Sequence, residues 1–146
     1  MTDNASPVAA QPDWHTDPNL SEKWKFRFGF FEKYGAPLAG ASFSGAHAAE
    51  MKAAFKQLSF GDRIKLNMNF YAFFFGFIYY AFFLKLWRQA LILIGCSLVY
   101  AIVAAILGIP DSVDRGVGIA YAMFCASRAN PLYYMKRTQG DIGWRI

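Results

Sequence analysis

The polar side chains that could do chemistry in this sequence lie inside or beside long apolar runs. Arg128 interrupts an otherwise uncharged stretch, residues 116–135. A cation within such a stretch is costly in a membrane and is often functional. We expect Arg128 to form a polar pocket that holds a lipid head group or a partner's carboxylate. The residues predicted to bind are Arg128, Asn130, Asn67, Asn69, Tyr79, Tyr80, Tyr133 and Tyr134. The alternative is that Arg128 only extends its side chain to the membrane surface.

Enzyme chemistry is not expected from this sequence. His15 and His47 stand outside the apolar runs, and no carboxylate pair, nucleophile elbow, phosphate-binding glycine loop or metal-ligand spacing is recognisable. Cys96 and Cys125 each lie within an apolar run and are interpreted as reduced packing residues. We therefore predict a protein without catalytic residues, metal or cofactor.

The elements that must position these residues are predicted to be membrane helices, in an all-α membrane protein. Of the 146 residues, 55% are hydrophobic, and the long apolar runs follow residue 65. Residues 66–84 carry no formal charge and include ten Phe or Tyr, and residues 89–110 are uncharged and rich in Leu, Ile, Val and Ala. A helix of the second length covers roughly 30 Å, the thickness of the hydrocarbon core.

The distribution of Lys and Arg predicts the topology. Positive residues favour the cytoplasmic side of a membrane. The numbers of Lys and Arg in the connecting segments agree best with this rule if residues 89–109 and 116–135 cross as a helical hairpin. The aromatic run then enters the membrane and returns on the same side. Gly76 is the expected break of this re-entrant or in-plane helical element, and Pro131 is expected to kink the last helix. The alternative is a plain three-span protein. The predicted membrane-surface anchors are Arg63, Lys65, Lys85, Trp87, Arg88, Lys136 and Arg137.

The N-terminal part is predicted to be cytoplasmic and interfacial. Residues 20–35 read as a helix that Ser21 can cap, with aromatic side chains that pack against the next helix or touch the membrane surface. Residues 47–58 form a second predicted helix, and Ser59 with Asp62 resembles a capping box that leads directly into the aromatic run.

These predictions divide the chain into five parts. They are a disordered tail at 1–19, a cytoplasmic amphipathic helical region at 20–65, an aromatic membrane-embedded element at 66–86, a two-helix transmembrane hairpin at 87–136 and a cytoplasmic tail at 137–146.

Several strings resemble a known family. They are Leu58 to Phe70, Ala72 to Gly76, the pair Tyr79-Tyr80, Leu86-Trp87-Arg88, Ala129-Asn130 and Tyr133-Tyr134. Together they resemble the small bacterial inner-membrane proteins of domain-of-unknown-function family 2628, over about residues 24–144. The family pattern has Pro after the glycine, where this chain has Phe77. The resemblance implies a location in the bacterial inner membrane and gives no activity.

Two functions are therefore expected from the sequence. The first is a non-enzymatic inner-membrane accessory, scaffold or regulatory protein that binds a protein partner, with toxin immunity as one form. The alternative is a small lipid-binding or transport protein that uses the pocket around Arg128. A multi-pass protein with both termini in the cytoplasm, in contact with anionic head groups, is expected in either case. A homo-oligomer is possible because small residues recur four apart in both spans, and nucleic acid is not an expected partner.

Overall fold

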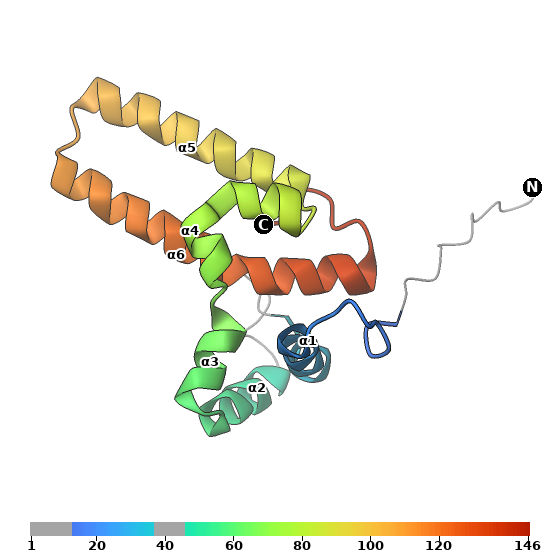
Figure 1. Cartoon of the computed structure of the whole chain (residues 1–146). Helices are drawn as coiled ribbons and strands as arrows, with labels where there is room; N and C mark the ends of the chain where they lie inside the picture. Colours follow the sequence, from blue (N-terminus) through green and yellow to red (C-terminus); the bar gives the residue numbers. More distant parts are fainter. Residues whose placement is uncertain (1–12, 37–45) are drawn as a thin grey trace, which may run out of the picture.

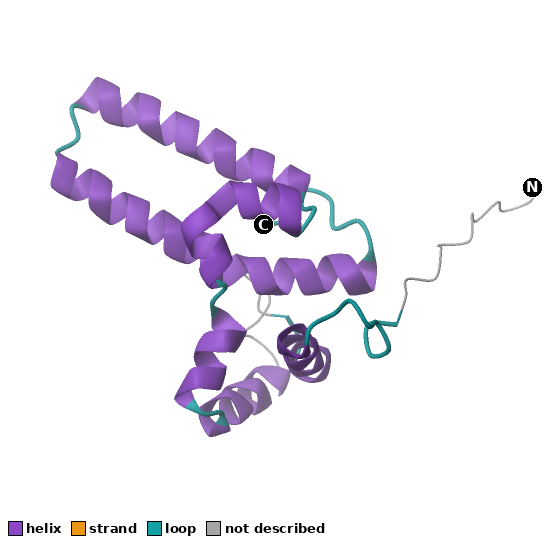
Figure 2. Cartoon of the chain, viewed as in Figure 1, coloured by secondary structure: helices purple, strands orange, loops and turns teal. Residues whose placement is uncertain are grey.

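The computed structural model describes residues 13–36 and 46–146, and these residues form helices and connecting turns with no strand among them (Figures 1 and 2). The elements are α1 (Glu22–Tyr34), α2 (Ala46–Gln57), α3 (Phe60–Asn67), α4 (Phe70–Ile78), the π-helical turn η1 (Tyr79–Phe83), α5 (Trp87–Leu107) and α6 (Asp111–Gln139). The all-helical class predicted from the sequence is confirmed for this part of the chain.

Helices α5 and α6 form a long antiparallel hairpin (Figure 1). Gly108 ends α5 in the left-handed conformation, with φ of 61°, which lets the chain turn towards Pro110. The end of the hairpin near this turn exposes large apolar side chains to the surroundings, among them Leu98, Val99, Ile102, Ile106, Val113 and Ile119. An exposed apolar surface of this extent is typical of a contact with lipid or with another protein.

Two helical stretches are long and apolar enough to cross a membrane. They are α5, of which only 11% of the most apolar window is buried, and Phe60–Phe83. By length and composition, these two stretches are candidate membrane spans. Helix α6 is longer but more polar, with Asp111 and Asp114 in its first turn and Arg128 in its interior.

The aromatic run contains both a break and a kink. The sequence predicted one helix leading directly from the capping box into the run, but α3 ends at Asn67 and α4 begins only at Phe70. Met68 and Asn69 between them are extended because the Asn69 side chain caps α4. The predicted bend at Gly76 is confirmed, since its φ of 45° and ψ of −125° interrupt the helix. Glycine alone can adopt this backbone conformation at little cost, so Pro at position 77 is not needed.

Both ends of the aromatic run meet the second half of α6. At the first end, the backbone N–H of Asn69 donates to the carbonyl of Ala126, at 3.0 Å. At the last end, the Lys136 ammonium donates to the carbonyl of Lys85. Between them, the Tyr80 hydroxyl donates to the carbonyl of Cys125, at 2.7 Å. Both ends of the run therefore adjoin the half of the hairpin that is farther from the turn at Gly108.

The N-terminal helix packs on α6 through aromatic rings. Phe28 and Phe31 are buried, and their rings lie 5.2 and 5.6 Å from that of Tyr134. Of the two interpretations of these aromatic residues, packing therefore describes this pair, although the partner is α6 and not the next helix. The Ser21 side chain does not cap α1, whereas the predicted cap at Ser59 is confirmed because its hydroxyl accepts a hydrogen bond from the N–H of Asp62.

The prediction of a disordered tail over residues 1–19 is wrong for residues 13–19, and residues 1–12 lie outside the described part of the chain. Trp14 is buried against Phe28, 5.6 Å between ring centroids, and His15 stacks on Trp14. Asp17 pairs with Arg137 at the end of α6. The buried ring and this ion pair both act against the entropy lost when the segment is ordered.

Helix α6 continues through Pro131, which is buried. Figure 1 shows the ribbon changing direction in the region where α4 crosses it, near Ala126. A proline lacks the N–H that would bond one turn earlier, so a change of direction here agrees with the predicted kink. Beyond Gln139 the chain folds back, and Ile142 is buried against the start of α5.

Candidate functional site

Three of the predicted binding residues, Asn69, Tyr79 and Asn130, meet at the break between α3 and α4. A helix that ends leaves carbonyl groups without partners, and one that begins leaves N–H groups without partners. Here the unpaired groups lie in the protein interior, where each would cost several kcal/mol in a membrane protein. Side chains from α1 and α6 supply the missing bonds, and we call this set the helix-break network: Arg27, Asn69, Tyr79, Asn130 and the carbonyls of residues 65, 66 and 68.

Two buried asparagines form the centre of the helix-break network. The Asn69 side-chain oxygen accepts from the N–H groups of Tyr71 and Ala72, at 3.2 and 3.4 Å. Its amide nitrogen donates to the Asn130 side-chain oxygen at 3.1 Å and to the Tyr79 hydroxyl at 3.4 Å. The Asn130 amide in turn donates to the Leu66 carbonyl at 2.9 Å. Every side-chain amide group of this pair is therefore used within the fold.

Arg27 completes the helix-break network from α1. Its guanidinium donates to the carbonyl of Lys65 at 2.7 Å and to that of Met68 at 3.2 Å, and it lies 4.5 Å from the centroid of the Trp24 ring. Only 2% of the residue is exposed. Burial lowers the pKa of Arg27 to about 10, so the side chain stays charged at neutral pH. This residue ties the N-terminal helix to the point where the chain enters the aromatic run.

The other predicted binding residues lie elsewhere. Asn67 is exposed at the end of α3. Tyr80 bonds to the backbone of α6, and the rings of Tyr133 and Tyr134 meet aromatic rings of α1 in tilted and edge-to-face contacts. Arg128 is half-buried, with its guanidinium 5.6 Å from the centroid of the Phe124 ring. The structure thus brings together Asn69, Asn130 and Tyr79, in a closed arrangement that stabilises the backbone.

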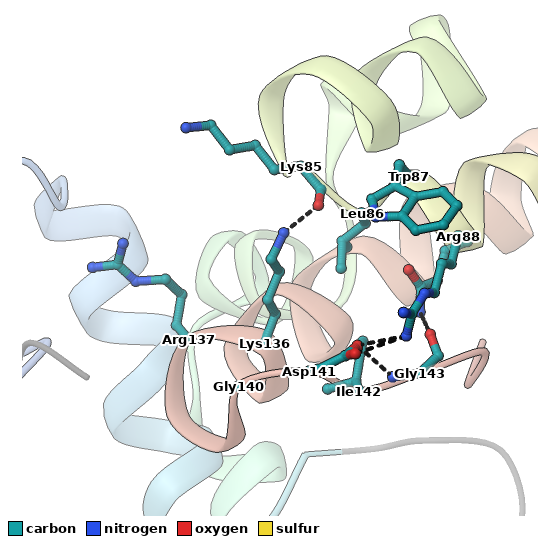
Figure 3. A pocket seen from close by; sticks show the side chains of 11 residues that line it. Lys85, Leu86, Trp87, Arg88, Lys136, Arg137, Gly140, Asp141, Ile142 and Gly143 are labelled. Carbon is teal, nitrogen blue, oxygen red and sulfur yellow. Dashed lines mark hydrogen bonds and ion pairs between the residues drawn. The ribbon is translucent and has the colours of Figure 1, made fainter. Parts of the chain in front are cut away.

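A second group of predicted residues lines a real cavity. Five of the seven predicted membrane-surface anchors surround a space of about 410 Å³ between the start of α5 and the end of α6 (Figure 3). We call it the basic pocket. Its lining residues are Lys85, Leu86, Trp87, Arg88, Gln89, Lys136, Arg137, Gly140, Asp141, Ile142 and Gly143.

The basic pocket is held together by side-chain contacts across the two chain segments. Arg88 pairs with both carboxylate oxygens of Asp141, at 2.8 and 2.9 Å. The hydrogen bond from the Gly143 N–H, together with the Arg88 guanidinium, lowers the pKa of Asp141. Gln89 is buried and donates to the carbonyls of Gly143 and Arg145, each at 2.9 Å. These bonds hold the C-terminal segment over the first turn of α5.

Lysines form the other wall of the basic pocket. In Figure 3 the Lys136 side chain extends to the carbonyl of Lys85, while the Lys85 ammonium points outward. Burial and the neighbouring Lys85 charge lower the pKa of Lys136. Lys85 has φ of 54° and is the one non-glycine residue with positive φ in the described part of the chain. A side chain is strained in this conformation, where glycine is usual.

The remaining predicted anchors, Arg63 and Lys65, lie on α3. Arg63 donates to the carbonyl of Leu58 at 3.0 Å, and Lys65 pairs with Asp62 at 2.9 Å. Sequence reasoning missed Arg27, Gln89 and Asp141. A basic residue between two aromatic residues on a predicted surface helix gave no reason to expect burial of Arg27, and the other two acquire their roles from contacts 53 or more residues away.

Comparisons with known proteins add a family and close relatives. The family described as "Protein of unknown function (DUF2628)" matches residues 11–138. "Uncharacterized protein YigF" of Escherichia coli strain K12 is 37% identical over 134 residues, which cover 92% of this chain and 98% of the relative. The protein of the same name from Salmonella typhimurium strain LT2 is 34% identical over the same shares. No solved structure matches the chain significantly.

Proposed function

We propose that this chain, which belongs to the DUF2628 family of bacterial proteins, is a non-enzymatic accessory or scaffold protein of the inner membrane. In this proposal the α5–α6 hairpin crosses the membrane, the aromatic run is a re-entrant element beside it, and α1–α3 form a cytoplasmic unit that binds a protein partner. Immunity to a membrane-acting toxin is one form that such binding could take.

The proposed topology is supported by the contacts of the aromatic run. Asn69 bonds to Ala126 and Lys85 bonds to Lys136, so both ends of the run adjoin the same half of α6. The opposite half of the hairpin exposes its apolar side chains. Irregular backbone at membrane depth requires internal hydrogen bonds, and the helix-break network supplies them where α3 ends.

A groove between α1 and α2 carries the proposal of a protein partner. It has a volume of about 480 Å³ and combines aromatic side chains of α1 with two lysines at its margin. Its lining residues are Lys25, Phe26, Gly29, Phe30, Lys33, Tyr34, Ala54, Gln57 and Leu58. Partly exposed Phe and Tyr rings next to lysine are suited to an amphipathic segment that carries acidic residues.

Cysteine labelling tests the proposed topology. In a background with Cys96→Ala and Cys125→Ala, a membrane-impermeant maleimide should label Lys85→Cys only when it has access to the cytoplasmic side. Asp114→Cys, in the turn region of the hairpin, should be labelled from outside. Labelling of Lys85→Cys only from outside would instead establish the three-span arrangement.

Site-specific photo-crosslinking tests the proposed partner. A photo-reactive phenylalanine in place of Phe30 or Phe26 should give a discrete protein adduct in cells. The matched control replaces Leu91, an exposed apolar residue of α5 outside the groove, and should not give that adduct. Adducts with lipid only at positions 26 and 30 would show that the groove faces the membrane and would contradict partner binding.

A further inference from the structure

The basic pocket has more positive charge than the protein itself neutralises. Four basic residues line it, against Asp141 as the one acidic lining residue. Arg137 turns away to pair with Asp17, and Arg88 pairs with Asp141. Lys85 and Lys136 remain next to each other, joined by a hydrogen bond between the ammonium of one and the carbonyl of the other. The Lys85 ammonium points outward, but its charge still lowers the pKa of Lys136, and a bound anion would offset this repulsion.

The first turn of α5 adds to this field. No side chain caps the N-terminus of α5, a helix of 21 residues. The free N–H groups and the helix dipole make such an end favourable for a phosphate. Since Trp87, Arg88 and Gln89 of this turn all line the basic pocket, the positive end of the helix is directed at the same space as the lysines.

Two exposed tryptophans indicate what kind of surroundings the basic pocket has. Trp87 and Trp144 are 55% and 60% exposed, and their rings meet edge to face, 6.1 Å between centroids. Arg88 lies over both rings, 5.2 and 5.9 Å from their centroids. Tryptophan rings of this exposure are typical of the boundary between hydrocarbon and water. The cavity is thus placed where lipid phosphates lie if α5 crosses the membrane.

Lys85 provides an independent observation. It occupies the left-handed turn after η1, where the N–H of Leu86 donates to the carbonyl of Tyr80 at 2.7 Å. Glycine is the residue that this helix-ending turn favours. A strained lysine at the opening of a cationic cavity is a reason to look for a function of its ammonium group.

We propose that the basic pocket binds the phosphates of an anionic phospholipid head group, with Lys85, Lys136 and Arg88 as the residues that contact them. The excess positive charge favours a head group with two phosphates, such as that of cardiolipin, over one with a single phosphate. Arg88 exchanges its bond with Asp141 for a bond with the phosphate. This site is separate from the groove between α1 and α2, and it does not depend on a protein partner.

Native mass spectrometry of the full-length protein in neutral detergent tests the proposal. The probes are cardiolipin, phosphatidylglycerol, phosphatidylcholine and soluble glycerol phosphate, each added at the same concentration. We expect cardiolipin to bind at least tenfold more tightly than phosphatidylcholine, with phosphatidylglycerol between them and no adduct with glycerol phosphate. Equal binding of phosphatidylcholine would overturn the proposal, and equal binding of glycerol phosphate would indicate a site for soluble anions.

Variants locate the site and separate binding from folding. Lys85→Gly removes the ammonium and also relieves the strained backbone, so its melting temperature in detergent should not decrease. Its affinity for cardiolipin should nevertheless decrease about fivefold or more, and adding Lys136→Gln should decrease it further. The matched control Lys52→Gln removes an exposed charge of α2 and should leave the affinity unchanged. The same decrease in Lys85→Gly and in Lys52→Gln would show that only net charge attracts the lipid.

Discussion

The two polar sites at the ends of the aromatic run differ in what their polar groups bind. The helix-break network consists of two neutral amides, a hydroxyl and one guanidinium, and their partners are each other and backbone atoms. The basic pocket consists of exposed or half-exposed charged groups around a cavity. In this fold one polar site replaces lost helix hydrogen bonds and the other lines a cavity.

The order of the chain explains why these sites occur where they do. The aromatic run enters where one helix ends and another begins, and the exposed backbone groups there need buried partners. It leaves through a short turn at Lys85, where α5 and the C-terminal segment already supply the packing. At the entry point the polar groups bond to one another and to backbone atoms, whereas at the exit point they line a cavity and the Lys85 ammonium points outward. Substitutions in each site test this difference.

Loss of Arg27 should be the most destabilising change in the helix-break network. Arg27→Ala leaves the carbonyls of Lys65 and Met68 without a charged donor and removes packing from Trp24, so we expect a loss of about 3 kcal/mol in the free energy of unfolding. Arg27→Lys should recover only part of it, because an ammonium on a flexible stem does not reproduce the forked geometry. Unfolding in mixed micelles with increasing SDS measures both. A loss below about 1 kcal/mol in Arg27→Ala would contradict the structural role.

Asn130 should come second. Asn130→Ala removes the donor to the Leu66 carbonyl and leaves the Asn69 amide nitrogen with only its 3.4 Å bond to the Tyr79 hydroxyl, which we expect to destabilise the protein by about 2 kcal/mol. Asn67→Ala is the matched control, because Asn67 is exposed and should change stability by less than about 0.5 kcal/mol. If cardiolipin affinity decreased in Asn130→Ala while stability stayed the same, the helix-break network would be a ligand site after all.

The sequence predicted the elements better than the roles of their polar residues. Helical periodicity, the capping box at Ser59 and the glycine at position 76 are local signals, and each gave a correct element or bend. The break at Met68 and Asn69 was missed because Asn69 lies within the uncharged run, and the buried partner of its amide nitrogen, Asn130, is sixty-one residues away. Periodicity carries no information about such a contact.

The predicted surface anchors show the same limit of sequence reasoning, because it identified the residues but not their convergence. Lys85, Trp87 and Arg88 were recognisable because basic and aromatic residues flank an apolar run. The cavity that they line was not, since its other wall comes from the end of α6 and from Asp141. The sequence could therefore nominate residues for the membrane surface, but only the fold shows which of them converge.

Gly76 connects the two sites, since it sets the direction in which the aromatic run returns. Gly76→Ala should destabilise by about 1.5 kcal/mol, because a side chain there is strained at φ of 45° although a Cβ would meet nothing within 4 Å. Gly95→Ala in α5 also meets nothing within 4 Å, and its helical backbone should make it neutral or stabilising by up to about 1 kcal/mol. Equal effects of the two substitutions on SDS unfolding would show that the bend is not imposed by the fold.

The smallest expected effect is a pH dependence of stability that the basic pocket shows and the helix-break network does not. Asp141 is exposed at the basic pocket, and its pKa is lowered below the ordinary value of 3.8. A carboxyl group with a lowered pKa in the folded state stabilises that state above its unfolded pKa, and this contribution is lost as the pH decreases through the folded value. The difference in melting temperature between the natural protein and Asp141→Asn should therefore be constant from pH 5 to 8, begin to decrease near pH 3.8 and disappear only once the pH is below the lowered pKa of the folded state. The difference for Asn130→Ala should persist over the whole range, because amides do not titrate. A pH-dependent Asn130→Ala difference would mean that the helix-break network contains a titrating group that its amide and guanidinium contacts do not include.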